Sequence, residues 1–300
     1  MRKKRGMTVK THAYLIMAHQ HFDLLGRLVR ALDSASAGFY IHIDRRAAGF
    51  DEQRLRQGVR GQIHVYRRYA VTWGADSQIR AEQLLLENAV KDGYDWYHLL
   101  SGVDIPLKPR AQIEAFFENR SESFLQIRPG ENAPETMERV QYYYPLQGKI
   151  GRPRADGGLV YGALQQLSYE CIKLQRALGV DRTKNAPFAY VRGANWFSIT
   201  HELAAYVVGR RKEIARYFYH SLNADEMFVQ CLAAASPYPV VNDCLRLIDW
   251  QRTEHDGCSP HTFTMADWAM LEASDKLFAR KFDPAVDADV IDALYRRIEG

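Results

Sequence analysis

The stretch "ADEMFVQ" (224–230) places two acids, Asp225 and Glu226, directly before a short apolar run. Acids favour the first turn of a helix, because free N–H groups and the helix dipole stabilise negative charge there. A carboxylate at a helix mouth beside apolar side chains is also suited to act as a general base. Taken alone, the stretch favours helix capping, so the rest of the chain must decide between the two roles.

Two further acids follow apolar runs. Asp44 comes after "GFYIHI", and Asp104 comes after "DWYHLLSGV". If both runs are strands of a parallel sheet, their carboxyl ends lie on the edge where such sheets bind ligands. For each acid, a turn or cap role explains the position equally well.

Motifs for the common cofactors are absent from the sequence. No G-x-G-x-x-G follows the first apolar run, and no P-loop, G-x-S-x-G or H-E-x-x-H motif occurs. The one Asp-x-Asp pair, Asp287 and Asp289, precedes a helical pattern and is better explained as helix capping. We therefore expect no bound metal, and any diphosphate would have to be neutralised by arginine and lysine.

The elements that must position these residues alternate along the chain. Expected strands are 12–19, 38–44, 63–69, 95–102 and 123–128, and expected helices are 21–32, 74–93, 110–118, 164–177, 200–216 and 223–235. Strand and helix in this order indicate an α/β fold with a mostly parallel central sheet flanked by helices.

The chain length suits one large domain. We expect residues 1–10, which include "MRKKRG", to form a basic flexible tail, and residues 11–300 to form a single domain. Between about 129 and 190 the pattern loosens into a segment rich in Gly, Pro, Arg and Tyr. Long irregular segments are uncommon unless they are functional or disordered, so we interpret this one as an irregular insertion that carries binding contacts.

Composition excludes several classes of protein. The chain has 47% hydrophobic and 25% charged residues, which is ordinary globular material, and its net charge of +4 is too mild to indicate nucleic-acid binding. The four cysteines show no metal-ligand spacing and are best explained as thiols of a reducing compartment. No apolar run is long enough for a transmembrane helix.

Seven segments in order resemble one known family: "AYLIMAHQHFDLLGRLVRALD", "FYIHIDRRA", "VTWGADSQIRAEQLLLENA", "DWYHLLSGVDIPLK", "RGANWFSIT", "ADEMFVQ" and "DKLFARKFDP". The family is that of the core-2/I-branching β-1,6-N-acetylglucosaminyltransferases and the peptide O-xylosyltransferases, glycosyltransferase family 14. The likeness runs from about residue 12 to 284, and "HLLSGVDIPLK" and "LFARKFDP" are its most specific parts. It implies a GT-A-like fold and an inverting, metal-independent transfer from a UDP-sugar.

The resemblance also implies roles for the donor site. Glu226 falls on the family's catalytic base, and Lys281 falls on the lysine that binds the donor diphosphate. An arginine upstream shares that task, for which Arg246 is our first choice and Arg252 the reserve. Without the resemblance, "FARKFD" is better explained as a solvated basic turn.

Asp44 resembles the family position near the uracil, and Asp104 lies in the family's D-x-P turn, so both are donor-binding candidates. For the acceptor, Glu135 and Arg139 correspond to charged family residues that contact the acceptor sugar. Trp196 is a candidate platform for a sugar ring, although a tryptophan is more often part of a core.

Three functions stay open at this stage. The first is transfer of N-acetylglucosamine from a UDP-sugar to a glycan hydroxyl in bacterial surface polysaccharide or glycoconjugate synthesis. The second is O-xylosyl transfer from UDP-xylose, and the third is a non-catalytic nucleotide-sugar or glycan-binding module. Animal family members carry a membrane anchor and many disulfides that this sequence lacks, so we expect a cytoplasmic protein, or one at the cytoplasmic face of the inner membrane, weakly attracted to it through the basic N-terminus.

Overall fold

The computed structural model describes residues 11–154, 157–253 and 259–299. The predicted basic tail, residues 1–10, lies outside the described residues, as does Cys258. The other three cysteines, Cys171, Cys231 and Cys244, are free thiols.

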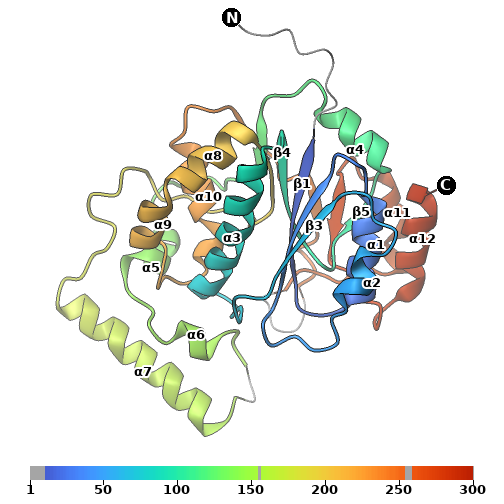
Figure 1. Cartoon of the computed structure of the whole chain (residues 1–300). Helices are drawn as coiled ribbons and strands as arrows, with labels where there is room; N and C mark the ends of the chain where they lie inside the picture. The colour runs from blue at the N-terminus through green and yellow to red at the C-terminus, as the bar shows by residue number, and fades with distance from the viewer. Residues whose placement is uncertain (1–10, 155–156, 254–258, 300) are drawn as a thin grey trace, which may run out of the picture.

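A seven-stranded sheet forms the centre of the described part of the chain, in the order β3-β2-β1-β4-β7-β6-β8 (Figure 1). Its strands are β1 (His12–Ala18), β2 (Gly38–Ile43), β3 (Gln62–Tyr66), β4 (Trp96–Ser101), β6 (Ser123–Leu125), β7 (Phe197–Thr200) and β8 (Val240–Asn242). Strands β3, β2, β1 and β4 run parallel, and β7 is antiparallel to both of its neighbours. The predicted α/β fold with a mostly parallel sheet is therefore confirmed.

A second, three-stranded sheet in the described residues has the order β5-β10-β9. Its strands are β5 (Ile105–Pro106), β9 (Arg246–Ile248) and β10 (Phe278–Arg280). Because β5 directly follows the Asp104 turn, this sheet brings the C-terminal part of the chain to the carboxyl end of β4.

Helices cover both faces of the main sheet (Figure 1). They are α1 (Phe22–Ala31), α2 (Glu52–Arg56), α3 (Asp76–Asp92), α4 (Arg110–Phe117), α5 (Pro134–Gln141), α6 (Gln147–Ile150), α7 (Gly158–Ala177), α8 (His201–Gly209), α9 (Arg211–Tyr217), α10 (Phe228–Ala234), α11 (Trp268–Ala273) and α12 (Ala288–Glu299), with 3₁₀ turns η1 (Ala224–Glu226) and η2 (Met265–Asp267). The segment from 129 to 190 is more helical than predicted, since it contains α5 and α6, and since α7 begins at Gly158, six residues before the predicted helix 164–177.

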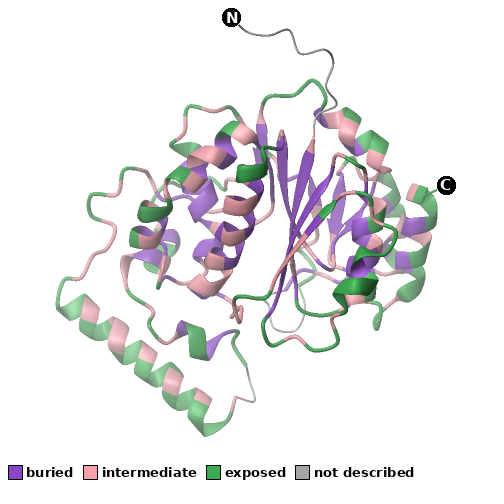
Figure 2. Cartoon of the chain, in the orientation of Figure 1, coloured by how far each residue is buried: buried purple, intermediate pink, exposed green. Residues whose placement is uncertain are grey.

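The strand β1 shows why the central strands are apolar on both sides. Ala13 and Leu15 pack into the cluster that includes α3, α8 and α10, whereas Tyr14 and Ile16 pack into the cluster under α1 and α4. A strand buried on both faces has a continuous apolar sequence without alternation, as "HAYLIMA" does. Figure 2 shows the resulting buried sheet, and also that α7 carries no buried residue.

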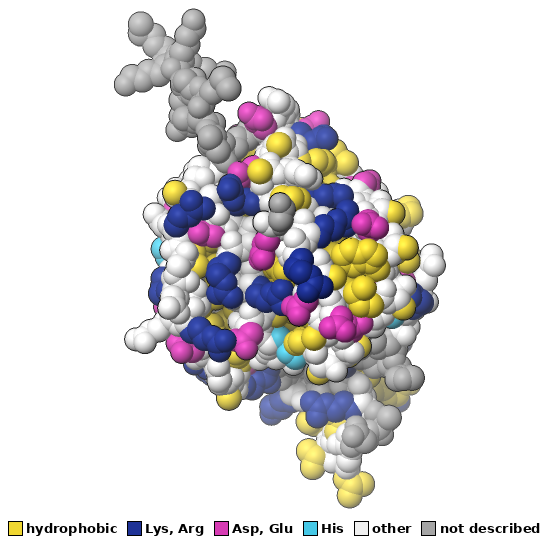
Figure 3. All heavy atoms as spheres, turned by 90° about the vertical axis from the view of Figure 1, so that its right-hand side faces the viewer, with side chains coloured by type: hydrophobic (Ala, Val, Ile, Leu, Met, Phe, Trp, Pro, Cys, Tyr) yellow, Lys and Arg dark blue, Asp and Glu magenta, His cyan; other side chains and the backbone are white. Residues whose placement is uncertain are grey.

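The face that carries the C-terminal helices mixes positive and negative side chains (Figure 3). Arg27 of α1 pairs with Asp292 of α12 at 2.5 Å, and Arg54 of α2 pairs with Asp23 at 3.0 Å. Interspersed pairs of this kind produce no field of one sign over this face.

Candidate active site

Glu226 ends the short turn η1, just before α10. Its side chain is 35% exposed, and one carboxylate oxygen, Oε2, accepts a hydrogen bond from Arg139 Nη1 of α5 at 2.7 Å. The other oxygen, Oε1, is therefore the one available to an incoming proton. The helical segment that contains Arg139 thus meets "ADEMFVQ" in space, 87 residues away in the chain.

Asp225 does not cap α10, whose N-cap is Met227 without a side-chain hydrogen bond. Its buried carboxylate instead accepts a hydrogen bond from Gln78 Nε2 of α3 at 3.0 Å. Burial, and next the charge of Glu226, raise the pKa of Asp225 to about 7, although Arg139 and backbone N–H groups act in the opposite direction. The two neighbouring acids therefore differ: one is buried, and the other reaches solvent.

A third acid, Glu82 of α3, lies close enough to Asp225 for their charges to interact, and the sequence analysis did not identify it. It is buried and accepts a hydrogen bond from Asn195 Nδ2 at 2.7 Å. Burial, and then the charge of Asp225, raise its pKa well above the ordinary value. The signal was present, because Glu82 shares the inward face of α3 with the buried Ile79 and Leu86, at spacings of three and four residues.

Residues 192–196 contact both Glu226 and Arg280 of β10, and so link the acidic part of the candidate site to its cationic part. The backbone N–H of Gly193 donates to the backbone oxygen of Glu226 at 3.0 Å. Two residues on, Asn195 binds Glu82, and the ring of Trp196 lies 3.9 Å from the guanidinium carbon of Arg280. The predicted acceptor platform Trp196 therefore contacts a cation of β10.

Strand β10 ends at Arg280, and Lys281 follows it, so two positively charged side chains come near the carboxyl end of β4. Ala279 pairs with Ile105 in register, and Phe282 N donates to Val103 O at 3.2 Å, so residues 280–282 run beside the Asp104 turn. Arg280 Nη1 lies 3.6 Å from Asp104 Oδ1, and half-buried Lys281 follows directly. Asp104 is fully buried and accepts hydrogen bonds from Ser101 N and Ser101 Oγ at 3.0 and 2.6 Å.

Arg280 is a second residue that the sequence interpretation missed. Its side chain is only 14% exposed, so the pKa of its guanidinium is lowered by desolvation, while the charge of Asp104 acts in the opposite direction. Its position beside Lys281, one residue earlier in "LFARKFD", is the signal that could have identified it.

Arg246, our first choice for the diphosphate, does not fit that role in the structure. It is 4% exposed, and its guanidinium donates to Ser198 Oγ at 2.7 Å and to the backbone oxygens of Cys244, Leu99 and Phe197 at 2.5, 3.1 and 2.8 Å. Burial lowers its pKa to about 10. Arg246 joins β9 to the main sheet, and its Nη1 and Nη2 groups are already bound to the protein, whereas its buried Nε has no hydrogen-bond partner among the described residues.

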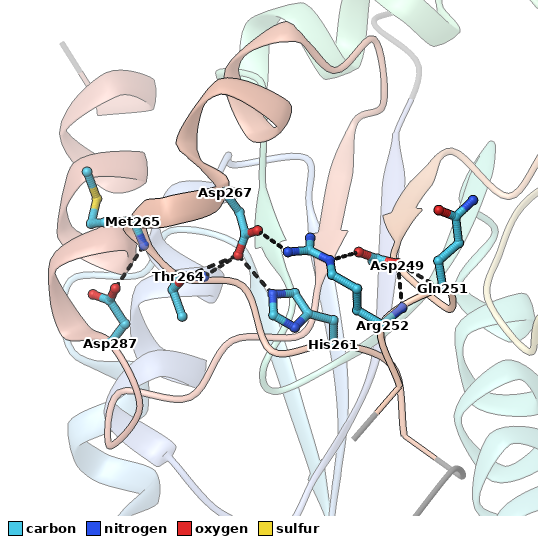
Figure 4. Close-up of polar contacts among 8 residues, drawn as sticks. All are labelled: Asp249, Gln251, Arg252, His261, Thr264, Met265, Asp267 and Asp287. Carbon is cyan, nitrogen blue, oxygen red and sulfur yellow. Dashed lines mark hydrogen bonds and ion pairs between the residues drawn. The ribbon is translucent and has the colours of Figure 1, made fainter. Parts of the chain in front are cut away.

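Arg252, the second candidate for binding the diphosphate, lies at the surface in a network of acids (Figure 4). Its side chain is 46% exposed and bridges Asp249 at 2.6 Å and Asp267 at 2.7 Å. Burial acts to raise the pKa of Asp267, but hydrogen bonds from Thr264, His261 and Arg252 together lower it to about 2. Because Phe263 N donates to Lys281 O at 3.0 Å, this network borders Lys281.

Asp44 closes the rim on the side of β2. It is 6% exposed, and it accepts hydrogen bonds from the backbone N–H groups of Arg46 and Val71 at 2.7 and 2.8 Å and from the Arg46 side chain. Burial acts to raise the pKa of Asp44, but these hydrogen bonds lower it overall. Asp44 therefore joins the loop after β2 to the loop between β3 and α3, and its donor-binding role stays a prediction.

Glu135 lies one turn before Arg139 on α5, so the two acceptor candidates share one face of that helix. Its side chain is 63% exposed, and its Oε1 atom lies 3.6 Å from Arg192 Nη2, at the start of the connecting segment. The predicted acceptor residues are therefore neighbours of Glu226 and of residues 192–196.

Within the described residues, no group of three or more His, Cys, Asp or Glu side chains is arranged to hold a metal ion. The predicted capping role is confirmed for Asp287 of the Asp-x-Asp pair, which accepts hydrogen bonds from Val290 N of α12 at 3.1 Å and from Met265 N at 2.8 Å. None of the helices in residues 11–154, 157–253 and 259–299 combines the length and apolar character needed to cross a membrane.

Comparisons with known proteins agree on one family. The model of the family described as "Branch: Core-2/I-Branching enzyme" matches residues 12–277. Human "Xylosyltransferase 2" is 25% identical over 308 residues, covering 94% of this chain and 33% of its own length. "Xylosyltransferase oxt" of Drosophila melanogaster is 24% identical over 292 residues, covering 88% of this chain and 31% of its own length. The chain thus spans about a third of the length of these curated relatives.

Proposed function

Because the chain belongs to the Core-2/I-branching enzyme family, we propose that it is a glycosyltransferase that moves a sugar from a UDP-sugar to a glycan hydroxyl. The observation that carries this proposal is the Glu226 carboxylate, which accepts a hydrogen bond from Arg139 at 2.7 Å on Oε2 and whose side chain is 35% exposed. The α/β architecture, a mostly parallel sheet between helices, is that of a GT-A-like fold.

In the proposed reaction Glu226 is the general base. The acceptor oxygen forms a bond to the anomeric carbon while its proton passes to Oε1 of Glu226. The bond from that carbon to the β-phosphate oxygen breaks, and UDP leaves with the electron pair, so the configuration inverts. A positioned carboxylate contributes about 10²–10⁴-fold to such a step.

Positive side chains neutralise the departing diphosphate in this proposal. Lys281 and Arg252 are the candidates for binding the diphosphate, because both lie next to the segment around Phe263 and Asp267. Arg280 adds a third cation beside Asp104. An ion pair at about 4 Å with an effective dielectric near 20 contributes about 4 kcal/mol, so two such contacts are adequate in size for a reaction without a divalent ion. Arginine supplies a bidentate fork and lysine a point charge.

The acceptor is proposed to bind beside α5. Glu135 and Arg139 lie on the face of α5 next to residues 192–196, and Trp196 offers a ring for sugar contact. The proposed acceptor is a glycan of a surface polysaccharide or glycoconjugate.

Two donor sugars compete. N-acetylglucosamine is the donor favoured by the sequence, whereas the names of the relatives favour xylose. Turnover of UDP-N-acetylglucosamine and UDP-xylose, assayed in parallel, separates these candidates. The basic N-terminus lies outside the described residues, and its weak attraction to a membrane stays a prediction.

The first prediction tests the base. Glu226→Gln keeps the size of the side chain but removes its basicity, so turnover should fall about 10²–10⁴-fold while UDP affinity stays the same. Glu138→Gln is the matched control, because Glu138 of α5 is also a partly exposed glutamate that pairs with an arginine, Arg176, at 2.6 Å. Near-normal turnover of Glu226→Gln would remove this residue from the role. UDP binding by a wild-type chain that neither transfers nor hydrolyses a donor would favour the non-catalytic binding module.

A further inference from the structure

Helix α7 is the most exposed element in the described part of the chain. None of its 20 residues is buried. Five aliphatic side chains on it or directly after it are largely exposed: Leu159 (94%), Val160 (76%), Leu167 (53%), Leu174 (60%) and Leu178 (71%). We call these five the α7 stripe. Figure 1 shows α7 as an outlying helix at the edge of the molecule.

Four of the five stripe side chains lie on one face of the helix, and Leu159 lies beside them in its first turn. Val160, Leu167, Leu174 and Leu178 recur at spacings of seven, seven and four residues, which places them above one another on a helix with 3.6 residues per turn. A different side of the helix is fastened to the body. Gln175 exchanges hydrogen bonds with the backbone of Tyr143 at 2.7 and 2.9 Å, and Arg176 pairs with Glu138 of α5 at 2.6 Å. The stripe is therefore left outside the core although the helix itself is held in place.

The segment around α7 is basic. Residues 149–184 contain seven basic and three acidic residues, a net charge of +4, and the whole chain also has a net charge of +4. The remaining residues are therefore neutral as a set, with 33 basic and 33 acidic residues. Lys149, Arg154, Lys173 and Lys184 are exposed in this segment.

We propose that α7 lies flat on an anionic lipid membrane, with the α7 stripe in the boundary between headgroups and acyl chains and the neighbouring cations on lipid phosphates. An exposed apolar face next to Lys and Arg is the pattern of an in-plane membrane helix. A helix of this length extends about 30 Å along the surface. The same helix is too polar to span the bilayer.

Charge favours a membrane over a second copy of this chain as the occupant. Pairing two copies through α7 would bring together two segments that each carry a net charge of +4. The one acid of α7, Glu170, already pairs with Lys173 of the same helix at 3.1 Å. The exposed side chains of the stripe are also aliphatic, whereas protein interfaces are typically anchored by aromatic residues and arginine.

One consequence rests on the proposed function. Helix α5 connects the two regions, because Glu138 binds Arg176 of α7 and the next residue, Arg139, binds Glu226. A membrane-bound α7 would therefore hold Glu226 near the lipid surface, where the glycan of a lipid-linked acceptor is presented.

The test is cosedimentation of the full chain with vesicles of phosphatidylcholine alone or with added phosphatidylglycerol, and it needs no enzyme activity. Wild type should bind the anionic vesicles and much less the neutral ones, and added salt should weaken binding. Leu167→Glu with Leu174→Glu should lower the partition coefficient at least about tenfold, because two apolar contacts are lost and negative charge is added. Val286→Glu is the matched control, since Val286 is 57% exposed outside α7 and should leave binding unchanged.

A charge variant and a mass measurement complete the design. Arg154→Gln and Lys184→Gln should each weaken anionic binding about fivefold. Equal binding to both vesicle types, or equal binding by the Leu167→Glu, Leu174→Glu variant, would overturn the proposal. The proposal would also be overturned if light scattering found wild type to be a dimer and the Leu167→Glu, Leu174→Glu variant to be a monomer. The stripe would then be covered by a second copy of the chain. Circular dichroism of every variant checks that the fold is kept.

Discussion

Two adjacent acids of one turn have opposite environments. Asp225 is 7% exposed and faces Glu82 and Gln78 of α3, whereas the side chain of Glu226 is 35% exposed and faces Arg139 of α5. Successive residues of a tight turn point in different directions, so one carboxyl enters the interior while its neighbour reaches the rim. The interior acid titrates near neutral pH, because burial and the charge of Glu226 outweigh Arg139 and the backbone N–H groups.

A prediction for stability follows from Asp225. Its folded-state pKa, about 7, lies above the ordinary value of 3.8 for aspartate, so the folded chain holds a proton that the unfolded chain releases. This contribution to stability is complete below about pH 4 and is lost as the pH rises through 7. The free energy of unfolding of wild type should therefore fall relative to that of Asp225→Asn over this range, by roughly 2–4 kcal/mol.

Urea unfolding of both proteins between pH 4 and 8 measures the difference. Asp275→Asn serves as a control for the loss of one surface charge, because the Asp275 side chain is 86% exposed. Parallel stability curves for wild type and Asp225→Asn would show that the burial of Asp225 has no effect on its proton affinity.

At the scale of elements, the connecting segment 192–196 depends on a close backbone approach. A Cβ atom at Gly193 would lie 1.7 Å from the backbone oxygen of Gln126 and 3.4 Å from Gln230. Only glycine allows this segment to pass so close to the end of β6. The same approach places the Gly193 N–H on the backbone of Glu226 and Trp196 on Arg280.

Gly193→Ala should consequently cost about 2–3 kcal/mol of unfolding free energy, since the backbone must shift to accept the methyl group. Turnover should fall further than the loss of folded protein explains, because the shift moves Glu226. Gly162→Ala is the control: nothing lies within 4 Å of its Cβ position in α7, so alanine should stabilise the helix by about 0.5–1 kcal/mol. Unchanged stability and turnover in Gly193→Ala would contradict the role given to this contact.

At the scale of the whole molecule, the candidate site is formed by residues from both ends of the chain, at the carboxyl ends of the N-terminal strands. The small sheet lays β10 beside β5, directly after the Asp104 turn, and Arg246 ties β9 to β4 and β7 through Leu99 and Phe197. The cations proposed for the diphosphate thus come from the end of the chain, whereas Asp44 and Asp104 come from its beginning. Donor binding is therefore expected to stabilise the fold as a unit.

UDP should raise the melting temperature of the full chain, with and without EDTA, because the proposed diphosphate contacts are side-chain cations. Ligand at about 100 times its Kd adds about 2.7 kcal/mol to stability. Arg252→Gln should reduce this rise, and Arg56→Gln should not, although the two arginine side chains are 46% and 45% exposed and both pair with acids. Loss of the rise in EDTA would contradict a metal-free site, and an unchanged rise in Arg252→Gln would remove this arginine from it.

The sequence by itself determined five strands of the main sheet, several helices, the α/β class and the family, but not β7, β8 or the three strands of the small sheet. These depend on the spacing of apolar residues and on short motifs, and both are properties of neighbours along the chain. Thus "HAYLIMA" predicts a strand buried on both faces, and "LFARKFD" marks the cationic segment wherever it folds. The exceptions were α5 and α6, short helices in a segment whose Gly, Pro and Arg content hides the apolar spacing, whereas the predicted helix 164–177 covers most of α7.

Only the tertiary structure decided which arginine is buried and which acids meet. Arg246 and Arg252 are six residues apart and equivalent as sequence, but the first lies under the small sheet and the second on the surface. Likewise, Glu226 meets Arg139, and Asp225 faces Glu82, only because α5, α3 and η1 pack together. Such contacts depend on how distant elements pack and not on local spacing, since burial and charge are set by every element that surrounds a side chain.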